Sequence, residues 1–285
     1  MSTVEFPSAA AARQETLEAL PENDGVFDGL RELYRFRELL LMWTDREIRI
    51  RYKQSVLGAA WAILQPLCLM LALTVVFSYF APMPSDGVPY PIFSYTALLP
   101  WTFFATAISF SVPSMTNNMQ LISKIYFPRE ILPLASVIVA FVDFLFATVV
   151  FAGLFFFYDI PVTLNLLWVA PLLLLQTVLI LGIVFWVSAL VVRFRDLRFV
   201  VPLTIQLWMY ASPIIYPMSV VPDKIKPFYQ LNPMAGLIES YREAVLRGGT
   251  PDAAPLLSAA LVSVALLISG YRFFKKSESE FADII

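Results

Sequence analysis

Histidine is absent from this 285-residue sequence, and cysteine occurs only once. Without histidine, the chain cannot contain a Ser-His-Asp triad, a histidine general base or a Cys/His metal centre. The single cysteine, Cys68, rules out a disulfide within the chain. It lies inside a long apolar run, and we expect it to be a small packing residue.

Charged residues are also scarce. They make up 15% of the sequence, against roughly 25% in soluble proteins, while 59% of residues are hydrophobic and the mean hydropathy is +0.71. No glycine is followed by lysine, so the nucleotide-binding pattern GxxxxGK[ST] is missing. The composition indicates a membrane protein that does not hydrolyse nucleotide through that fold, and we expect no catalytic residues, cofactor or metal in this chain.

Six apolar stretches are long enough to cross a bilayer, which needs about 20 helical residues. The predicted fold is therefore an all-α membrane protein with six transmembrane helices. A Pro/Asp/Gly loop at 82–90 separates the first span from the second, and a short turn at 159–163 separates the third from the fourth. The six predicted spans are residues 56–81, 91–112, 131–158, 164–192, 199–216 and 253–274.

Basic residues predict the orientation of these spans. Sixteen lysines and arginines lie on the side that carries both termini, and four lie on the other side, all within 217–252. Because basic residues accumulate on the cytoplasmic side, both termini are predicted to be cytoplasmic.

The chain before the first span divides into two predicted parts. Residues 1–29 are polar, have no signal-like apolar region and are predicted to be a flexible cytoplasmic tail. Residues 30–55 show a helical apolar rhythm through Phe36, Leu40, Trp43 and Ile50, which predicts an amphipathic helix in the membrane surface. The alternative is an ordinary soluble amphipathic helix. The six-span domain then covers 56–274, and 275–285 form a cytoplasmic tail.

The segment 217–252 is too polar to span and too apolar for a simple loop. A break at Asn232 and Pro233 precedes a predicted short helix over 238–246. We expect two short re-entrant helices that dip into the outer leaflet, because broken backbone at membrane depth is tolerated where it packs on protein. The alternative is a helix that lies on the outer surface.

Two features within the spans and turns have alternative interpretations. Asp143 is the single carboxylate of the predicted spans, and it forms either a polar contact between helices or a proton relay. The turn over 114–131 combines polar residues expected to face water, such as Lys124 and Arg129, with an apolar side. This pattern favours a knob that docks a cytoplasmic partner over a plain connector.

Aromatic residues gather near the predicted outer ends of the spans. Such residues commonly form the interfacial belt of a membrane protein. Some could instead turn inward and line a route for sugar rings. The candidates for this pathway are Phe77, Tyr79, Tyr95, Trp208, Tyr210 and Tyr216.

Several short motifs resemble one family in their order. They are RYKQSVLG at 51–58 followed by Trp61 and Pro66, NMQLISKIYFP at 118–128, Arg195-Asp196, SPIIY at 212–216, and LNP at 231–233 followed by Tyr241-Arg242. Together they resemble the permease subunits of type-2 ABC exporters for polysaccharides of the O-antigen, capsule and teichoic-acid kinds. The resemblance runs from about residue 31 to the end.

The resemblance implies a half-transporter of the bacterial inner membrane that moves a lipid-linked glycan outward. A second copy would complete the pore, and two cytoplasmic ATPase subunits would bind ATP and Mg; no nucleic acid partner is implied. The ATPase-docking residues would be Arg46, Arg49, Asn118, Leu121, Lys124, Tyr126, Phe127 and Arg129. The outer gate would contain Asn232, Pro233, Glu239, Tyr241 and Arg242.

Three other functions compete with this one. The nearest is a type-2 exporter that moves drugs or lipids. An ATP-independent flippase or channel would need no docking turn. A membrane-embedded transferase would need polar catalytic groups at one interface, and the outer side offers only Asp159, Asp223, Glu239 and Arg242.

Overall fold

A computed structural model describes residues 26–53, 55–122 and 124–281. All regular secondary structure in these ranges is helical. The predicted tail at 1–29 lies almost wholly outside the described residues. The motif positions Gln54 and Ser123, and the last four residues, 282–285, also lie outside them.

Five helical segments are long and apolar enough to cross a membrane. They coincide with the predicted spans one to four and six. In chain order they are α4 (Ala60–Val75) with the π-helix η1 (Val76–Phe80), α5 (Tyr90–Thr116), α7 (Ile131–Phe157), η2 (Leu164–Trp168) with α8 (Val169–Arg193), and α12 (Ala253–Phe281).

The predicted fifth span is only partly helical. It contains α9 (Leu197–Tyr210), which has 14 residues, after which the chain makes turns from Ala211 to Ser212 and beyond. At 1.5 Å per residue α9 is about 21 Å long, shorter than the roughly 30 Å hydrocarbon core of a bilayer. The apolar run was long enough to suggest a full span, but SPIIYP at 212–217 leaves the helix. The structure therefore does not confirm a sixth transmembrane helix.

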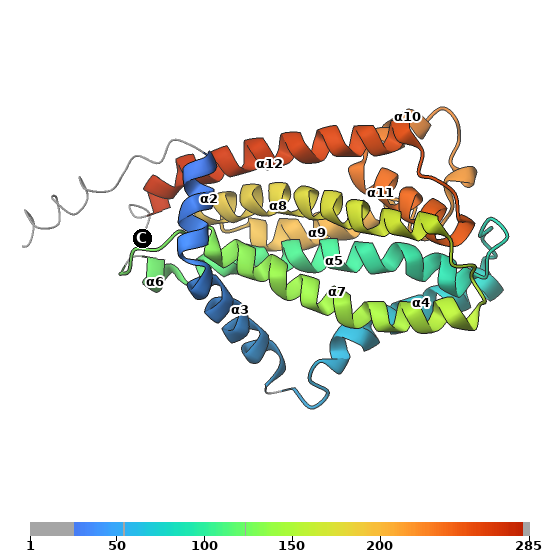
Figure 1. Ribbon diagram of the computed structural model, residues 1–285, viewed down its shortest axis with the longest axis horizontal. Helices are drawn as coiled ribbons and strands as arrows, with labels where there is room; N and C mark the ends of the chain where they lie inside the picture. Colours follow the sequence, from blue (N-terminus) through green and yellow to red (C-terminus); the bar gives the residue numbers. More distant parts are fainter. Residues whose placement is uncertain (1–25, 54, 123, 282–285) are drawn as a thin grey trace, which may run out of the picture.

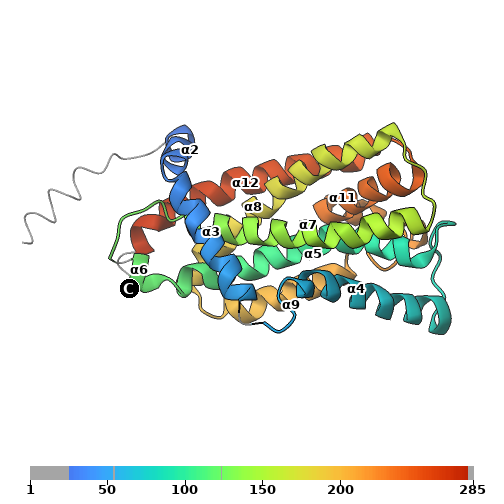
Figure 2. The same ribbon diagram turned by 60° about the horizontal axis from the view of Figure 1, so that its bottom comes forward.

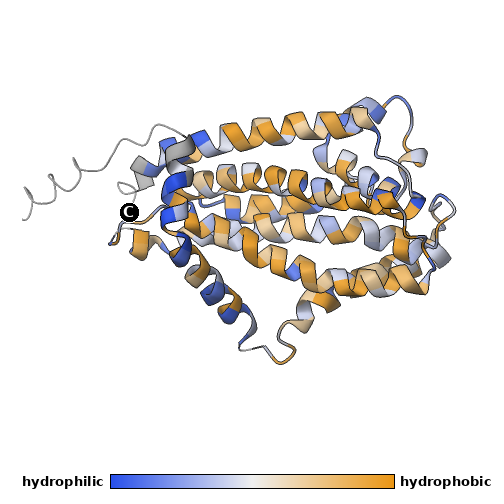
Figure 3. Cartoon of the chain, in the orientation of Figure 1, coloured by the Kyte–Doolittle hydropathy of each residue, from blue (hydrophilic) through white to orange (hydrophobic). Residues whose placement is uncertain are grey.

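The long helices lie nearly parallel, with α5 at the centre (Figures 1 and 2). Helix α5 packs against α4, α7, α8, α9 and α11, while α8 pairs most extensively with α12. The apolar residues run along these helices, and the polar ones gather at the two ends and on α2 and α3 (Figure 3). We name these the α6 end, with α2 (Val26–Arg35), α6 (Met119–Ile122) and the end of α12, and the α11 end, with α11 (Pro233–Arg242).

Close packing of α8 on α12 depends on two glycines. A Cβ atom on Gly182 would lie 2.6 Å from the backbone nitrogen of Leu267, and one on Gly270 would clash with the carbonyl oxygen of Gly182. Small residues let two helix backbones approach in this way inside a membrane. Gly153 of α7, by contrast, has open space at its Cβ position.

The predicted helix over 30–55 is two helices. Helix α2 ends at Arg35, and α3 (Arg37–Tyr52) begins after a break at Phe36. Phe36, Leu40 and Trp43 share one apolar face, which packs against buried residues of the α6 end; the predicted position in the membrane surface stays a prediction. The prediction is wrong for Ile50, which is 60% exposed and does not share the buried face. The reason is that α3 slants away from this cluster toward the middle of the bundle (Figure 1).

The segment between α9 and α12 folds into four short pieces. They are η3 (Met218–Val220), α10 (Lys226–Leu231), α11 and the π-helix η4 (Glu243–Arg247). All residues of α11 except Glu239 are buried, and α11 packs on α5, α8 and α12. The predicted break at Asn232 is confirmed, and the alternative of a helix lying on the outer surface is wrong for α11.

Cys68 was expected to be a small packing residue. It is exposed on α4, a helix that buries only Pro66 and Met70. The prediction of a packing role within this chain is therefore wrong. An apolar run alone does not reveal which face of a helix is covered by its own chain.

Replacing Gly270 or Gly182 by alanine is expected to destabilise the α8–α12 pair by about 1–3 kcal/mol, the usual cost of overpacking. Thermal unfolding of the purified chain in detergent measures the effect. Gly153→Ala is the matched control, because its new methyl group meets no neighbour. Equal melting temperatures for all three variants would contradict the close-packing argument.

Candidate functional site

The turn at the α6 end exposes part of the predicted docking surface. Lys124, Ile125 and Tyr126 are exposed, the last two by 58% and 59%. Asn118 and Leu121 are half-buried, and the Asn118 amide donates a hydrogen bond to the Ser114 carbonyl at 2.7 Å.

Phe127 does not belong to this exposed surface, since it is 5% exposed and lies in the buried cluster at the α6 end. It anchors the turn instead of presenting a side chain to a partner. The amphipathic pattern alone could not distinguish the apolar residues that hold the turn from those that remain outside.

Arg129 was predicted to face water, and this prediction is wrong. Its side chain is only 17% exposed, and its guanidinium donates to the backbone carbonyl of Glu278 and lies 4.0 Å from the Glu278 carboxylate. The cause is the last turns of α12, which return beside this loop. No local sequence signal announces that neighbour.

A second ion pair reinforces the same junction. Lys275 Nζ lies 2.5 Å from the Glu130 carboxylate and 3.0 Å from that of Glu278. Glu130 is 3% exposed, and burial raises the pKa of its carboxyl above the ordinary value despite the nearby lysine. The loop and the end of α12 are thus held together by a partly buried charge network.

The two predicted docking arginines of α3 reach the surface. Arg49 pairs with Asp45 at 2.7 Å, and both side chains are more than half exposed. Arg46 pairs with Glu47 at 3.2 Å and lies over the Trp43 ring, 4.5 Å from its centroid. Such exposed pairs contribute little stability, so these arginines are available for other contacts.

Deeper in the bundle, the end of α3 is joined to α7. Arg51 Nη2 lies 2.9 Å from Asp143 Oδ2, and the Tyr52 hydroxyl donates to Asp143 Oδ1. The Arg51 guanidinium also covers the Phe110 ring, 3.9 Å from its centroid. This confirms the interpretation of Asp143 as a polar contact between helices. An intramembrane carboxylate needs such a partner because a lone charge there is costly.

At the α11 end, Arg242 holds the turns that follow α9. It is 1% exposed and donates to the carbonyl oxygens of Pro213 at 2.6 Å and Ile214 at 2.9 Å. Its guanidinium also lies over the Phe93 ring, 3.7 Å from the centroid. Two carbonyl groups of the turns that follow α9 therefore find their donors on this side chain.

Asn232 joins the same turns to the start of α11. Its amide oxygen accepts from Trp208 Nε1 at 3.0 Å and from the Met234 backbone N–H at 3.1 Å, which caps the helix. Its amide nitrogen donates to Ser212 Oγ at 3.0 Å. Pro233 follows as the first helical residue, where proline is favoured.

The other predicted gate residues join α11 to its surroundings. The Tyr241 hydroxyl donates to Gln176 Oε1 at 3.1 Å, and Gln176 donates to the Pro100 carbonyl at 2.7 Å. Glu239 pairs with Arg247 at 2.7 Å, and Arg247 pairs with Asp86 of the 82–90 loop at the same distance. Gln176 escaped the sequence analysis because one glutamine in an apolar run carries no signal of its partners.

The predicted pathway aromatics divide into buried and exposed residues. Tyr95 is fully buried, and its hydroxyl donates to the Ala147 carbonyl at 3.0 Å. The prediction that Tyr95 lines a pathway for sugar rings is therefore wrong. Trp208 and Phe77 are half-buried, the first bound to Asn232.

Two of the remaining aromatics stay on the surface of the chain. Tyr79 is 78% exposed and Tyr210 is 56% exposed. Tyr216 is half-buried, and its hydroxyl is 2.8 Å from the Tyr210 carbonyl and 2.6 Å from the Tyr229 hydroxyl. Only Tyr79 and Tyr210 therefore offer free aromatic faces.

Comparisons with known proteins match this chain to one family. The model of the ABC-2 type transporter family matches residues 38–246. An O-antigen export system permease protein, RfbA of Myxococcus xanthus, is 31% identical over 90% of this chain and 98% of its own length. The protein of that name from Klebsiella pneumoniae is 32% identical over 87% and 95%. A polysialic acid transport protein, KpsM of Escherichia coli, is 26% identical over 82% and 91%.

Asp143→Asn is expected to destabilise the fold by about 3–5 kcal/mol, because it leaves the Arg51 guanidinium without its counter-charge. The double variant with Arg51→Gln is expected to recover part of this loss. Thermal unfolding in detergent measures both. Arg49→Gln is the control, since its exposed pair is worth about 0–1 kcal/mol. Strictly additive losses in the two single variants would contradict a direct interaction.

Arg242→Met is expected to lower the melting temperature strongly, because it leaves two buried carbonyl groups without donors at about 1–3 kcal/mol each. Arg247→Met, which removes a surface-exposed network, is expected to cost much less. The same unfolding assay compares them. A smaller loss for Arg242→Met than for Arg247→Met would refute the role assigned to Arg242.

Proposed function

The chain belongs to the ABC-2 type transporter family, and we propose that it is the membrane subunit of an exporter that carries a lipid-linked polysaccharide out of the cytoplasm. It is the permease component of a polysaccharide ABC exporter. The observation that carries this conclusion is the agreement of the relatives over most of both chains, since three of them at 31–32% identity are O-antigen export permeases. O-antigen-like glycan is accordingly the proposed cargo.

The α6 end is the proposed cytoplasmic side of the inner membrane. It contains α2, the start of α3 and the end of α12, and fifteen of the nineteen basic residues in the described ranges belong to the segments that begin or end there. Basic residues are retained on that side. Helix α9 begins at this end, and the chain reaches the α11 end before α12 begins (Figure 1). We therefore assign a sixth crossing to α9 together with the turns that Arg242 supports.

Two separate cytoplasmic subunits are proposed to bind and hydrolyse the ATP that drives transport. Their proposed docking surface consists of Lys124, Ile125 and Tyr126 with the neighbouring α2. The Tyr126 hydroxyl already bonds the Glu32 carboxylate of α2 at 3.0 Å, so the two parts form one surface. Apolar and basic groups side by side on an exposed turn suit a protein contact.

Two polar junctions connect this surface to the transmembrane helices. Arg129 and Glu278 join the docking turn to α12, and Arg51 and Asp143 join α3 to α7. When the ATPase subunits close, they bias the helices toward a second arrangement through these junctions. Helix α11, held by Arg242 and Asn232, forms the proposed re-entrant gate at the outer side.

A second copy of this chain completes the pathway. Helices α4 and α9 flank α5 on one side of the bundle and expose much of their surface (Figure 2). Tyr79 lies on η1, which continues α4, and Tyr210 ends α9, so these two residues are the proposed aromatic wall for sugar rings. A neutral wall suits a polar glycan, because fixed charges would bind or repel it strongly.

Lys124→Glu is expected to reduce polysaccharide-stimulated ATPase activity severalfold in the reconstituted complex, because it reverses a charge on the docking surface. Lys224→Glu makes the same change on an exposed residue in the segment before α11 and is expected to have no effect. Arg129 is a poor probe, since its loss would also break the junction with Glu278. Equal ATPase activity in both lysine variants would refute the docking role of Lys124.

Co-purification from membranes tests the subunit assignment itself. A complex of two copies with two ATPase subunits is expected, and its ATPase activity is expected to rise with lipid-linked glycan. A chain that transports glycan alone, without any ATPase subunit, would contradict the proposal and favour an ATP-independent flippase.

A further inference from the structure

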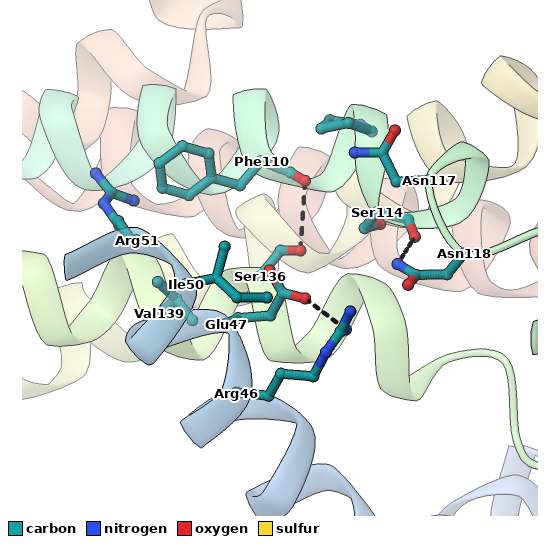
Figure 4. Close-up of a pocket in the computed structure, with 11 residues that line it drawn as sticks. Arg46, Glu47, Ile50, Arg51, Phe110, Ser114, Asn117, Asn118, Ser136 and Val139 are labelled. Atoms are coloured by element: carbon teal, nitrogen blue, oxygen red, sulfur yellow. Dashed lines mark hydrogen bonds and ion pairs between the residues drawn. The ribbon is translucent and has the colours of Figure 1, made fainter. Parts of the chain in front are cut away.

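A polar pocket of about 290 Å³ lies beneath α3, against α5 and α7 (Figure 4). Its wall combines the polar face of α3 with apolar residues of α5 and α7, among them Phe110 and Val139. Its lining combines two guanidinium groups, one carboxylate, two side-chain amides and two hydroxyls. The polar lining residues are Arg46, Glu47, Arg51, Ser114, Asn117, Asn118 and Ser136.

Both arginines of the pocket have a carboxylate partner, Glu47 on the pocket wall and Asp143 beside it. Arg46 pairs with Glu47 at 3.2 Å, and Arg51 pairs with Asp143 at 2.9 Å. The Arg51 Nη1 atom is nevertheless buried and has no hydrogen-bond partner among the described residues. One strong donor is therefore unused, although its guanidinium is charge-balanced. Such a buried donor calls for an acceptor from a ligand.

In the orientation proposed above, this part of α3 lies near the lipid headgroups on the cytoplasmic side. A neighbouring hollow of about 650 Å³ shares Arg46 and Ile50 with it and is lined further by Asp45, Arg49 and Lys53. Basic residues at this depth meet phosphate groups of the adjoining leaflet. Ile50 is 60% exposed beside them and provides an apolar surface for the chains of a lipid.

We propose that this pocket binds the headgroup of a zwitterionic phospholipid, a phosphodiester that carries a primary ammonium group. Arg46 and the free Nη1 of Arg51 bind the phosphate oxygens, since guanidinium groups bind phosphate with charge-assisted hydrogen bonds. The Glu47 carboxylate accepts hydrogen bonds from the ammonium group. The amides of Asn117 and Asn118 supply further donors and acceptors along the wall.

Charge balance selects this ligand over more acidic ones. Each arginine of the pocket already has a carboxylate, so the site has no large positive surplus for a diphosphate or another multiply charged anion. A zwitterion exchanges one ion pair for another and leaves the net charge of the site unchanged. Buried ion pairs are tolerable only when such compensation is complete. This site is independent of the export function proposed above.

Lipid retention by the purified full-length chain tests the proposal. The chain in detergent receives equal amounts of dioleoyl phosphatidylethanolamine, phosphatidylcholine and phosphatidylglycerol, and native mass spectrometry counts the bound lipids. Phosphatidylethanolamine is expected to dominate. Phosphatidylcholine differs only by three N-methyl groups that remove the N–H donors, so the comparison isolates the contact with Glu47.

Variants assign the two halves of the headgroup. Glu47→Gln is expected to remove a roughly tenfold preference for phosphatidylethanolamine over phosphatidylcholine, the worth of one charge-assisted hydrogen bond. Glu47→Asp is expected to keep part of it. Arg46→Gln is expected to weaken retention of all three lipids. Arg37→Gln, an exposed arginine of α3 outside the pocket, is the matched control and is expected to change nothing.

Three results would overturn the proposal. They are equal retention of phosphatidylethanolamine and phosphatidylcholine, preferential retention of phosphatidylglycerol, and an unchanged preference in Glu47→Gln. A polyprenyl diphosphate is added as a competitor, to distinguish a phospholipid ligand from a lipid carrier that also contains phosphate. If it displaces phosphatidylethanolamine from the wild-type chain but not from Arg46→Gln, the pocket belongs to a lipid carrier and the proposal fails.

Discussion

A polar group inside an apolar bundle is costly without a hydrogen-bond partner, and this constraint explains why several segments of the chain lie together. Arg242 supplies donors where α9 stops being a helix, Asn232 caps α11 and binds Trp208, and Asp143 receives Arg51 and Tyr52. Each contact joins segments that are distant in sequence. In water, these groups would be satisfied by solvent and would not define the fold; in hydrocarbon, they determine which elements lie together.

The sequence predicted those parts of the fold that depend on local composition. Long apolar runs gave the positions of α5, α7, α8 and α12 within a few residues, and Asn232-Pro233 gave the break before α11. It did not predict the short α9, because SPIIYP at 212–217 is apolar enough to extend a hydropathy count but does not continue the helix. The break at Phe36 has the same origin, since a periodic apolar pattern continues across it.

Predicting the candidate site required knowledge of which segments are neighbours. Arg242 and Asn232 entered through family resemblance, and the structure brings them together around one turn. Phe127 and Tyr95 were assigned exposed roles and are buried, because residue type indicates affinity for apolar surroundings without indicating their source. Arg129 and the Gln176 network depend on distant partners in α12 and α11, which no local pattern reveals.

The two attachments of α3 have a mechanical consequence. The first half of α3 is held in the apolar cluster at the α6 end through Leu40 and Trp43, and its last turn is held on α7 through Arg51, so α3 is attached to the bundle at two separate places. While both attachments hold, we expect α3 and α7 to move together and not to slide past each other. A displacement of α3 at the α6 end is therefore expected to tilt α7. The size of the tilt would depend on how far from Asp143 the displacement occurs.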